Sequence, residues 1–422
     1  MEMTRVQLAQ GVNLTYLPAR KFKTSLLSAQ FVTPLRQETA GANALLAAVL
    51  RRGTVSCPEM GAISARMDNL YDASIDYTVR KKGENQCVGF VASFIDDRYA
   101  PGGEHLLEPV AELLGELVCD PVTYHGRFVP EYFDSEKRNL LEAIRSIIND
   151  KRDWADSRLL RTLCAGELYA VPRLGDEETV DKLQALRVYD QYRQLISTAP
   201  LEIIYSGSAD LERVRLALAA AFATLPREEV RMISAAVPHV GRETVQYVED
   251  ALDVTQGKLG MGFSCGSSDM PALLMGNTLF GGSSNSKLFL NVREKLSLCY
   301  YASSLYHRQK GLITVSSGIE FQNYQRAYDE IMAQLEAVQK GELEDWELEG
   351  ARSTLLNSYA TVGDSQGKLE NFYLGQAATG QTETPEALAR AIETMTADRI
   401  CQAMETVRLD TVYFLKGKEV EA

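Results

Sequence analysis

The two halves of the chain close with the same order of elements: a helix, a short turn and an apolar strand that ends in glycine. The sequence LEIIYSG closes the first half at residues 201–207, and DTVYFLKG closes the second half at residues 410–417. A chain of 422 residues is too long for one ordinary hydrophobic core. The repeated order of elements therefore predicts two similar domains of about 200 residues, at 1–226 and 227–422, rather than one domain.

The first half alternates strand-like and helix-like segments. Short runs of β-branched and apolar residues predict strands, and apolar residues at helical spacing predict helices. The predicted strands are 12–18, 24–32, 73–80, 86–95 and 201–207, and the predicted helices are 42–52, 58–70, 104–118, 130–149, 178–197 and 209–223. Ser56, followed by Pro58 and Glu59, has the pattern of a capping box and predicts where the helix that ends near Leu70 begins.

The second half repeats this alternation. Its predicted strands are 243–249, 259–265, 299–306, 311–319 and 410–417, and its predicted helices are 271–280, 323–339, 343–361, 364–378 and 396–407. Hairpin-like strand pairs dominate over strand–helix–strand units, which argues against a doubly wound parallel sheet. The predicted fold class is α+β, with an antiparallel-rich sheet packed with helices in each half.

The charge of the chain excludes some classes of partner. The net charge is −13, whereas a general nucleic-acid binder needs a basic face that neutralises phosphates. The same charge argues against docking on anionic membranes. An acidic surface would suit basic peptides, although most acidic proteins are simply soluble.

The sequence also indicates the compartment. The N-terminal residues MEMTRVQLAQGVNLTYLP lack the basic start, apolar core and cleavage site of a secretion signal, and no apolar run approaches the roughly 20 residues that span a bilayer. The seven cysteines are scattered, odd in number and never in a CxxC pair. We therefore expect a cytoplasmic protein with buried thiols. The four histidines stand too far apart in sequence for a two-histidine metal site on one helix: His105, His125, His239 and His307.

The segment GGSSNSKLFLNVREKLSLCYY at residues 281–301 carries the candidate functional residues. A Gly-rich run leads into a helix that contains Arg293, and Tyr300 follows seven residues later at the start of an apolar run. No GKS or GKT follows the glycines, so the run is not a phosphate-binding P-loop. We interpret Gly281, Gly282 and Ser283 as a flexible loop that faces a substrate.

This segment, the repeated order of elements and the frame of residues 41–54 resemble the M16 peptidase family of pitrilysin-like and mitochondrial-processing-peptidase-like zinc enzymes. The segments SEKRNLLEAIRSIIND and LGDEETVDKL and both closing strands add to the resemblance, which runs over essentially the whole chain. It implies two homologous α/β-sandwich halves of the LuxS/MPP-like type. Among bacterial members, the sequence is similar to inactive subunits associated with 5-aminopentanol modification of elongation factor EF-P and with peptide maturation.

The resemblance also implies where a metal site would lie. Members carry an HxxEH motif whose two histidines bind zinc and whose glutamate activates water, and a later glutamate is the third ligand. In this chain the histidine positions fall on Ala44 and Ala48 and the first glutamate on Ala47. The later glutamate, counted seven residues from Glu136, falls on Ala143. Alanine offers no lone pair to zinc, so we expect no metal and no cofactor in this chain.

Two residues of the family's substrate-binding half are kept. The resemblance implies that Arg293 engages the substrate backbone and that the Tyr300 hydroxyl stabilises the oxyanion when water attacks the scissile carbonyl. The alternative is an Arg293 ion pair with Glu294 and a Tyr300 that is merely packed beside its neighbours.

The residues leave three functional hypotheses. The first is the non-catalytic subunit of a heterodimeric M16 peptidase, in which a zinc-bearing partner cleaves peptides, including leader peptides, and this chain supplies Arg293 and Tyr300. The second is a structural or peptide-binding pseudo-peptidase with no role in the chemistry. The third is an independent hydrolase with an unrelated site, for which neither cysteine–histidine nor serine–histidine proximity can be read from the sequence.

Overall fold

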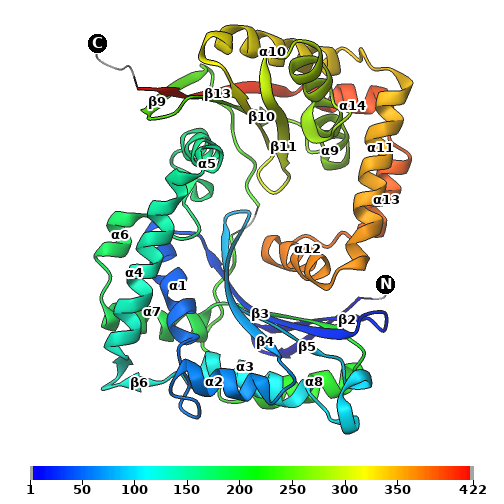
Figure 1. Ribbon diagram of the computed structural model, residues 1–422. Helices are drawn as coiled ribbons and strands as arrows, with labels where there is room; N and C mark the ends of the chain where they lie inside the picture. Colours follow the sequence, from blue (N-terminus) through cyan, green and yellow to red (C-terminus); the bar gives the residue numbers. More distant parts are fainter. Residues whose placement is uncertain (1–2, 235, 419–422) are drawn as a thin grey trace. The chain divides into compact units, whose positions relative to one another are not determined.

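The computed structural model describes residues 3–234 and 236–418, which form two compact units (Figure 1). Unit 1 comprises Met1–Arg145, Val171–Ala235 and Gly363–Thr382, and unit 2 comprises Ser146–Ala170, Ala236–Val362 and Glu383–Ala422. Each unit has its own sheet. In the sequence, all strands of the first sheet precede residue 226 and all strands of the second sheet follow it. Two helical segments, however, belong to the unit of the other half of the chain.

The sheet of unit 1 has six strands in the order β1-β2-β8-β3-β5-β4. Only β2 and β8 pair in parallel, and β4 forms one edge of the sheet. The strands are β1 (Thr4–Ala9), β2 (Val12–Pro18), β3 (Thr24–Pro34), β4 (Ser74–Lys82), β5 (Asn85–Ile95) and β8 (Leu201–Gly207).

Helices cover both faces of this sheet (Figure 1). The main core of unit 1 lies between one face of the sheet and four helices: α1 (Gln37–Leu50), α3 (Leu107–Cys119), α7 (Ala185–Thr198) and α8 (Leu211–Ala221). The other face carries α12 (Gln366–Thr379), where the β3 side chain Ser28 donates a hydrogen bond to Glu370. The remaining elements of unit 1 are α2 (Met60–Asp68), α4 (Pro130–Ser146), α6 (Glu177–Asp181), β6 (Thr123–Tyr124), β7 (Arg127–Phe128) and the short 3-10 turns Asp97–Tyr99 and Pro101–Gly103. The 3-10 turn Ile147–Asn149 follows α4 and belongs to unit 2.

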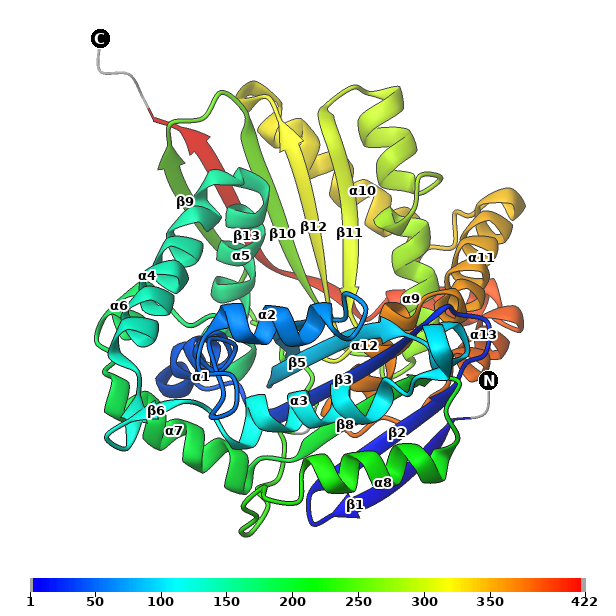
Figure 2. The ribbon, with the colours of Figure 1, turned by 60° about the horizontal axis from the view of Figure 1, so that its bottom comes forward.

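The sheet of unit 2 repeats this topology with five strands in the order β11-β12-β10-β13-β9 (Figure 2). Again the closing strand of the half, β13 (Val407–Gly417), pairs in parallel with one neighbour, β9 (Gln246–Leu252). The other strands are β10 (Gly257–Cys265), β11 (Cys299–His307) and β12 (Leu312–Ile319). Strand for strand, β9, β10, β11, β12 and β13 repeat β2, β3, β4, β5 and β8, which confirms the predicted duplication.

One face of the second sheet packs against α5 (Lys151–Leu163), whose Ala155 and Leu159 join Tyr413 and Leu415 in an apolar cluster. The main core of unit 2 contains α9 (Met270–Asn277), the π-helical turns η5 (Thr278–Gly282) and η6 (Leu288–Lys295), α10 (Tyr324–Gln339), α11 (Asp345–Ala360), α13 (Pro385–Glu393) and α14 (Ala397–Met404). The 3-10 turns of this region are η4 (Leu168–Ala170), η7 (Phe321–Asn323) and η8 (Thr361–Asp364). The helices α5 and α12 therefore play equivalent roles, and each covers the sheet formed mostly by the other half of the sequence.

Most predicted elements are confirmed within a few residues, but one helix start is wrong. Helix α2 begins at Met60 with Glu59 as its N-cap, and no side chain caps it. Ser56 instead contacts the carboxylate of Glu116 and lies outside the helix. Three further elements, β1, α5 and α13, are not among those predicted from the sequence.

None of the helices in the part of the chain that the structure describes combines the length and apolar character that crossing a bilayer requires.

Candidate functional site

Three of the four positions implied for a metal site face one cavity of unit 1. Helix α1 is buried along its length from Ala40 to Leu50, as an Ala-rich and Leu-rich helix can be on every side. Ala44 and Ala48, one turn apart on this helix, line a cavity of about 800 Å³ together with Ala143 of α4. The fourth position, Ala47, is 1 % exposed, belongs to the main core and does not line the cavity.

The register of α4 agrees with this placement. Glu136, the earlier glutamate from which Ala143 was counted, also lines the cavity, whereas the exposed Glu142 does not. The Glu136 carboxylate accepts a hydrogen bond from Arg52 at 2.9 Å and one from Asn139 at 3.1 Å. The negative charge of Glu136 is therefore matched by the guanidinium of Arg52.

The cavity does not fit zinc. The methyl groups of Ala44, Ala48 and Ala143 offer no lone pairs, and Glu136, the one lining carboxylate, is paired with Arg52. Cationic side chains line the same space: Arg80, Lys81, Lys82 and Arg173. These charges would repel a divalent cation, which adds to the loss of the ligands.

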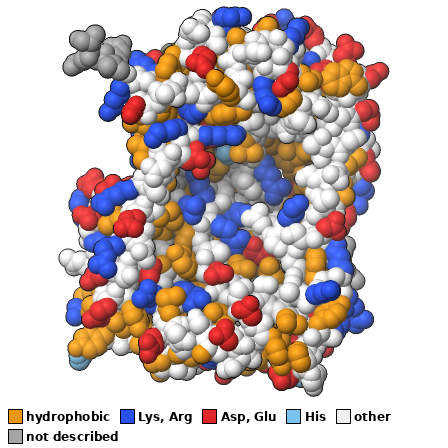
Figure 3. Space-filling view, in the orientation of Figure 1, with side chains coloured by type: hydrophobic (Ala, Val, Ile, Leu, Met, Phe, Trp, Pro, Cys, Tyr) orange, Lys and Arg blue, Asp and Glu red, His pale blue; other side chains and the backbone are white. Residues whose placement is uncertain are grey.

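Three of these cations come from the end of the edge strand β4. The Arg80 guanidinium forms two hydrogen bonds of 2.6 Å with the buried Glu370 carboxylate on α12. Lys82 donates to the side-chain oxygen of Asn371 at 2.6 Å and to its carbonyl at 3.2 Å. Lys and Arg side chains gather over the β4 region in the space-filling view (Figure 3). In the sequence these residues only stand at the end of a predicted strand, and nothing there indicates that they lie beside the cavity.

Arg293 lies on the π-helical turn η6 of unit 2. Its guanidinium is 3.4 Å from the Glu294 carboxylate and 4.6 Å from the centre of the Phe289 ring. The Glu294 contact is the ion pair that the alternative interpretation describes. The side chain remains about 41 % exposed, so it can still meet another molecule.

Tyr300 lies on β11, an edge strand of the second sheet, and is 62 % exposed rather than packed against its neighbours. Its hydroxyl donates a hydrogen bond of 2.7 Å to Glu320. This hydrogen bond and the negative charge of Glu320 raise the pKa of the Tyr300 hydroxyl. The hydroxyl therefore stays protonated at neutral pH and can act as a hydrogen-bond donor.

The Gly-rich run is more structured than the predicted flexible loop. Gly281 and Gly282 end the π-helical turn η5, and Gly281 is buried. A Cβ at Gly281 would lie 2.7 Å from both Leu288 and the Ser304 hydroxyl, so close packing requires glycine there. The exposed Gly282 and the partly exposed Ser283 remain the positions that a substrate could reach.

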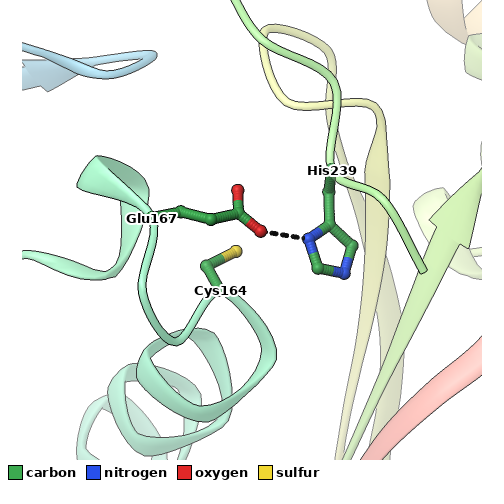
Figure 4. A group of neighbouring side chains, drawn as sticks. All are labelled: Cys164, Glu167 and His239. Carbon is green, nitrogen blue, oxygen red and sulfur yellow. Dashed lines mark hydrogen bonds and ion pairs between the residues drawn. The ribbon is translucent and has the colours of Figure 1, made fainter. Parts of the chain in front are cut away.

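Within residues 3–234 and 236–418, one group of His, Cys, Asp and Glu side chains is close enough to hold a metal (Figure 4). Cys164, Glu167 and His239 place their ligand atoms within 4.8 Å of one another in unit 2. The Glu167 carboxylate, however, is 2.6 Å from the imidazole Nδ1 of His239 and forms an ion pair with the buried Lys310. An ammonium group already supplies the positive charge here, which disfavours a metal cation.

The second nitrogen of His239 extends this group into a charged network. Nε2 lies 3.3 Å from Asp410 on β13, and Arg242 donates to Asp410 through its main-chain N–H at 2.7 Å. Burial raises the pKa of Asp410, but the Arg242 N–H, the Thr411 hydroxyl and the Arg242 charge outweigh it and hold that pKa below its usual value. The network ties β13 to two loops. His239 lies 72 and 171 residues from its partners in sequence, so spacing could not reveal it.

The sequence GFSCG at residues 262–266 matches the G-x-S-x-G pattern of a serine-hydrolase nucleophile elbow. That elbow is a strained turn between a strand and a helix. Ser264 instead lies within β10, paired with Leu312 on one side and Arg408 on the other. The motif therefore lacks the geometry of a nucleophile, which argues against the independent-hydrolase hypothesis.

Comparisons with known proteins point to one family. Residues 182–355 match the family model described as "Peptidase M16 inactive domain". The chain is 35 % identical over 416 residues to the "probable inactive metalloprotease YmfF" of Bacillus subtilis, covering 97 % of this chain and 96 % of that protein. A solved structure of a conserved protein from Enterococcus faecalis superposes over the full length of both chains with a TM-score of 0.90 and 27 % identity. The M16 inactive-domain structure from Pseudomonas fluorescens has a TM-score of 0.81 and 16 % identity, covers 100 % of this chain and 99 % of that chain, and shares the fold.

Proposed function

The chain belongs to the M16 peptidase family as one of its inactive members, and we propose that it is the non-catalytic subunit of a heterodimeric M16 zinc peptidase. A zinc-bearing M16 partner supplies the metal ligands and the activated water. This chain supplies Arg293 and Tyr300 to the shared site. The substrates of the pair are peptides. That they include leader peptides, and that the chain is associated with EF-P modification, are predictions that depend on the family resemblance alone.

One contrast carries the proposal. The four positions implied for the metal site are alanine, three of them at a cation-lined cavity, whereas Arg293 and Tyr300 are present and solvent-accessible on unit 2. An exposed arginine and an exposed tyrosine hydroxyl can reach a substrate held by another subunit. In this role Arg293 binds main-chain carbonyl groups, and Tyr300 donates to the oxygen on which negative charge develops.

Both residues must exchange partners on substrate binding. Tyr300 gives up its hydrogen bond to Glu320, and Arg293 turns from Glu294 toward the substrate. Both contacts lie at the surface, where water competes for the same groups, so the exchange costs little.

The same two contacts support a second candidate, a structural or peptide-binding pseudo-peptidase. In it, Arg293 and Tyr300 have their partners within this chain and take no part in chemistry. The two candidates differ in whether removing the Tyr300 hydroxyl changes catalysis.

The test is peptide cleavage by this chain mixed with the HxxEH-bearing M16 protein of the same genome. We expect cleavage to need both proteins and to fall roughly tenfold or more with Tyr300→Phe, because one oxyanion donor is worth about 2.7–4 kcal/mol. The matched control is Tyr247→Phe, which removes a hydroxyl from an exposed tyrosine on β9, the opposite edge strand of the same sheet.

We expect Tyr300→Phe to lower kcat, and the affinity of the two subunits to stay unchanged in a separate binding measurement. Cleavage by the partner alone, at the same rate with or without this chain, would favour the second candidate. A loss of subunit affinity with unchanged kcat would likewise assign Tyr300 to assembly rather than to chemistry.

A further inference from the structure

We propose that the outer edge of β9 in unit 2 binds an extended basic segment of another protein, which adds to the five-stranded sheet as a sixth strand. This inference concerns unit 2 alone and does not depend on the proposed heterodimer. The surface lies at the edge of the sheet opposite to β11, the strand that carries Tyr300.

The outer edge of β9 has no partner strand among the described residues. β9 pairs only with β13, and it ends the sheet on the side opposite to β11 (Figure 2). None of its seven residues is buried. An edge strand presents unpaired main-chain N–H and C=O groups, to which an extended peptide can bind.

The internal repeat indicates which kind of element fits this edge. In unit 1 the corresponding strand β2 lies between β8 and a further strand, β1, which pairs with it antiparallel. Unit 2 repeats β2 as β9 and β8 as β13, but its described residues contain no counterpart of β1. The second sheet therefore lacks an antiparallel strand where the first sheet has one, and an extended segment of another chain can take that place.

The charge of the edge favours a basic segment. Residues 243–253, which contain β9, carry four carboxylates and no lysine or arginine. Two of these carboxylates pair with basic side chains of β13 and α5. The other two, Glu243 and Asp253, are exposed and have no ionic partner among the described residues. Because opposite charges on neighbouring strands stabilise a sheet, basic side chains suit the added strand.

Aromatic rings beside β9 give a second reason to expect cations. Tyr247 is 59 % exposed, and its hydroxyl lies 3.4 Å from that of Tyr328 on α10. Burial, then Tyr247 and Glu249, raise the pKa of Tyr324 on the same helix, so the Glu249 carboxylate acts on this group of rings. The faces of tyrosine rings attract the cationic groups of lysine and arginine.

A second copy of this chain fits the edge less well. If two β9 strands paired antiparallel about a two-fold axis, acidic residues of one strand would lie across from those of the other. Like charges opposite each other destabilise a sheet. The acidic residues thus protect the edge against copies of itself and leave it open to a basic segment.

The test is fluorescence anisotropy of a labelled peptide of alternating lysine and valine with the purified full chain at about 150 mM salt, where exposed charges are screened beyond about 8 Å. We expect saturable binding of this peptide and none of the corresponding glutamate–valine peptide. N-methylation of the main chain keeps the charges but removes the donors that strand addition requires. It should weaken binding roughly tenfold or more.

Two combined variants locate the site. One removes three carboxylates of the edge: Glu243→Gln, Glu249→Gln and Asp253→Asn. The control removes three exposed carboxylates elsewhere in unit 2: Glu342→Gln, Glu393→Gln and Asp398→Asn. The edge variant should weaken binding roughly tenfold or more, whereas the control should retain the affinity. Thermal unfolding checks that both variants remain folded.

The ring of Tyr247 gives a test that leaves charge unchanged. Tyr247→Ser should weaken binding about two- to fivefold, whereas Tyr247→Phe keeps the ring and should retain the affinity. Equal losses in the edge and control charge variants would overturn the proposal, as would equal binding of the N-methylated peptide. So would a homodimer in analytical ultracentrifugation that Tyr247→Ser dissociates, because a second copy would then occupy the edge.

Discussion

Ala44, Ala48 and Ala143 show how much a single methyl group decides at the residue scale. Each side chain is too small and too apolar to bind a metal, and together the three leave an open cavity. The identities of these residues, and the chemistry they exclude, could be read from the sequence. The sequence could not show that these three side chains face one cavity or that Ala47 is buried in the core. Helix spacing alone does not reveal how α1 and α4 are placed in the fold.

Gly281 provides a prediction at the same scale. Gly281→Ala should destabilise the protein by about 1–3 kcal/mol, because the new Cβ would lie 2.7 Å from Leu288 and 2.8 Å from the main-chain nitrogen of Ser304. Urea unfolding measures the change.

The matched control is Gly61→Ala in helix α2, where a Cβ meets no atom within 4 Å. This change should stabilise the protein by about 0.5–1 kcal/mol, because alanine loses less backbone entropy than glycine in a helix. If Gly281→Ala left stability unchanged but abolished cleavage by the reconstituted pair, the glycine would serve the substrate rather than the packing.

At the scale of elements, α1, α4 and the edge strand β4 form the cavity together. The sequence predicts all three elements: α1 from its apolar run, α4 from apolar residues at helical spacing and β4 from a short strand-like run. The charge that β4 adds to the cavity was not predicted. In the sequence Arg80, Lys81 and Lys82 only stand at the end of a predicted strand, and only the fold brings them to the cavity that α1 and α4 also line.

This charge leads to a prediction about restoring the metal site. Ala44→His, Ala47→Glu, Ala48→His and Ala143→Glu together should give only weak zinc binding, because the lining cations oppose a divalent ion. Adding Lys81→Gln, Lys82→Gln and Arg173→Gln to this variant should raise the zinc affinity roughly tenfold or more.

Competition with a chromophoric zinc chelator measures both affinities, and the unchanged chain provides the baseline. Thermal unfolding checks that Glu at the buried position 47 leaves the protein folded. Equal zinc affinities with and without the three Gln substitutions would show that the lining charges do not control the metal.

At the scale of the whole molecule, the two halves of the chain repeat one topology, and each half contributes one helix to the unit of the other half. Helix α5 follows α4 and joins the second sheet, and α12 follows α11 and joins the first. All strands of the first sheet precede residue 226 and all strands of the second follow it, but each sheet is covered by one helix from the other half of the sequence. Sequence patterns assign a helix to a stretch of chain, whereas the sheet on which it packs depends on surfaces that form only in the folded molecule.

The exchange predicts that the fragment 227–422 does not fold compactly alone. Without α5, the sheet face around Tyr413 and Leu415 loses Ala155 and Leu159 and becomes exposed. We expect this fragment to bind a hydrophobic dye and to unfold without a cooperative transition. Adding a peptide of residues 146–170 should reduce dye binding, and a fragment that is cooperative and dye-free without it would contradict the prediction.

The sequence by itself determines the twofold repeat, the strands and helices with strong apolar periods, and the absence of metal-binding side chains at Ala44, Ala47, Ala48 and Ala143. These properties depend on residue identity and on neighbours within a few positions. The tertiary structure alone decides the exchange of α5 and α12, the cation-lined cavity and the network of Glu167, His239 and Asp410. The physical reason is that charges and apolar faces act across space, and these partners come from segments far apart in the chain.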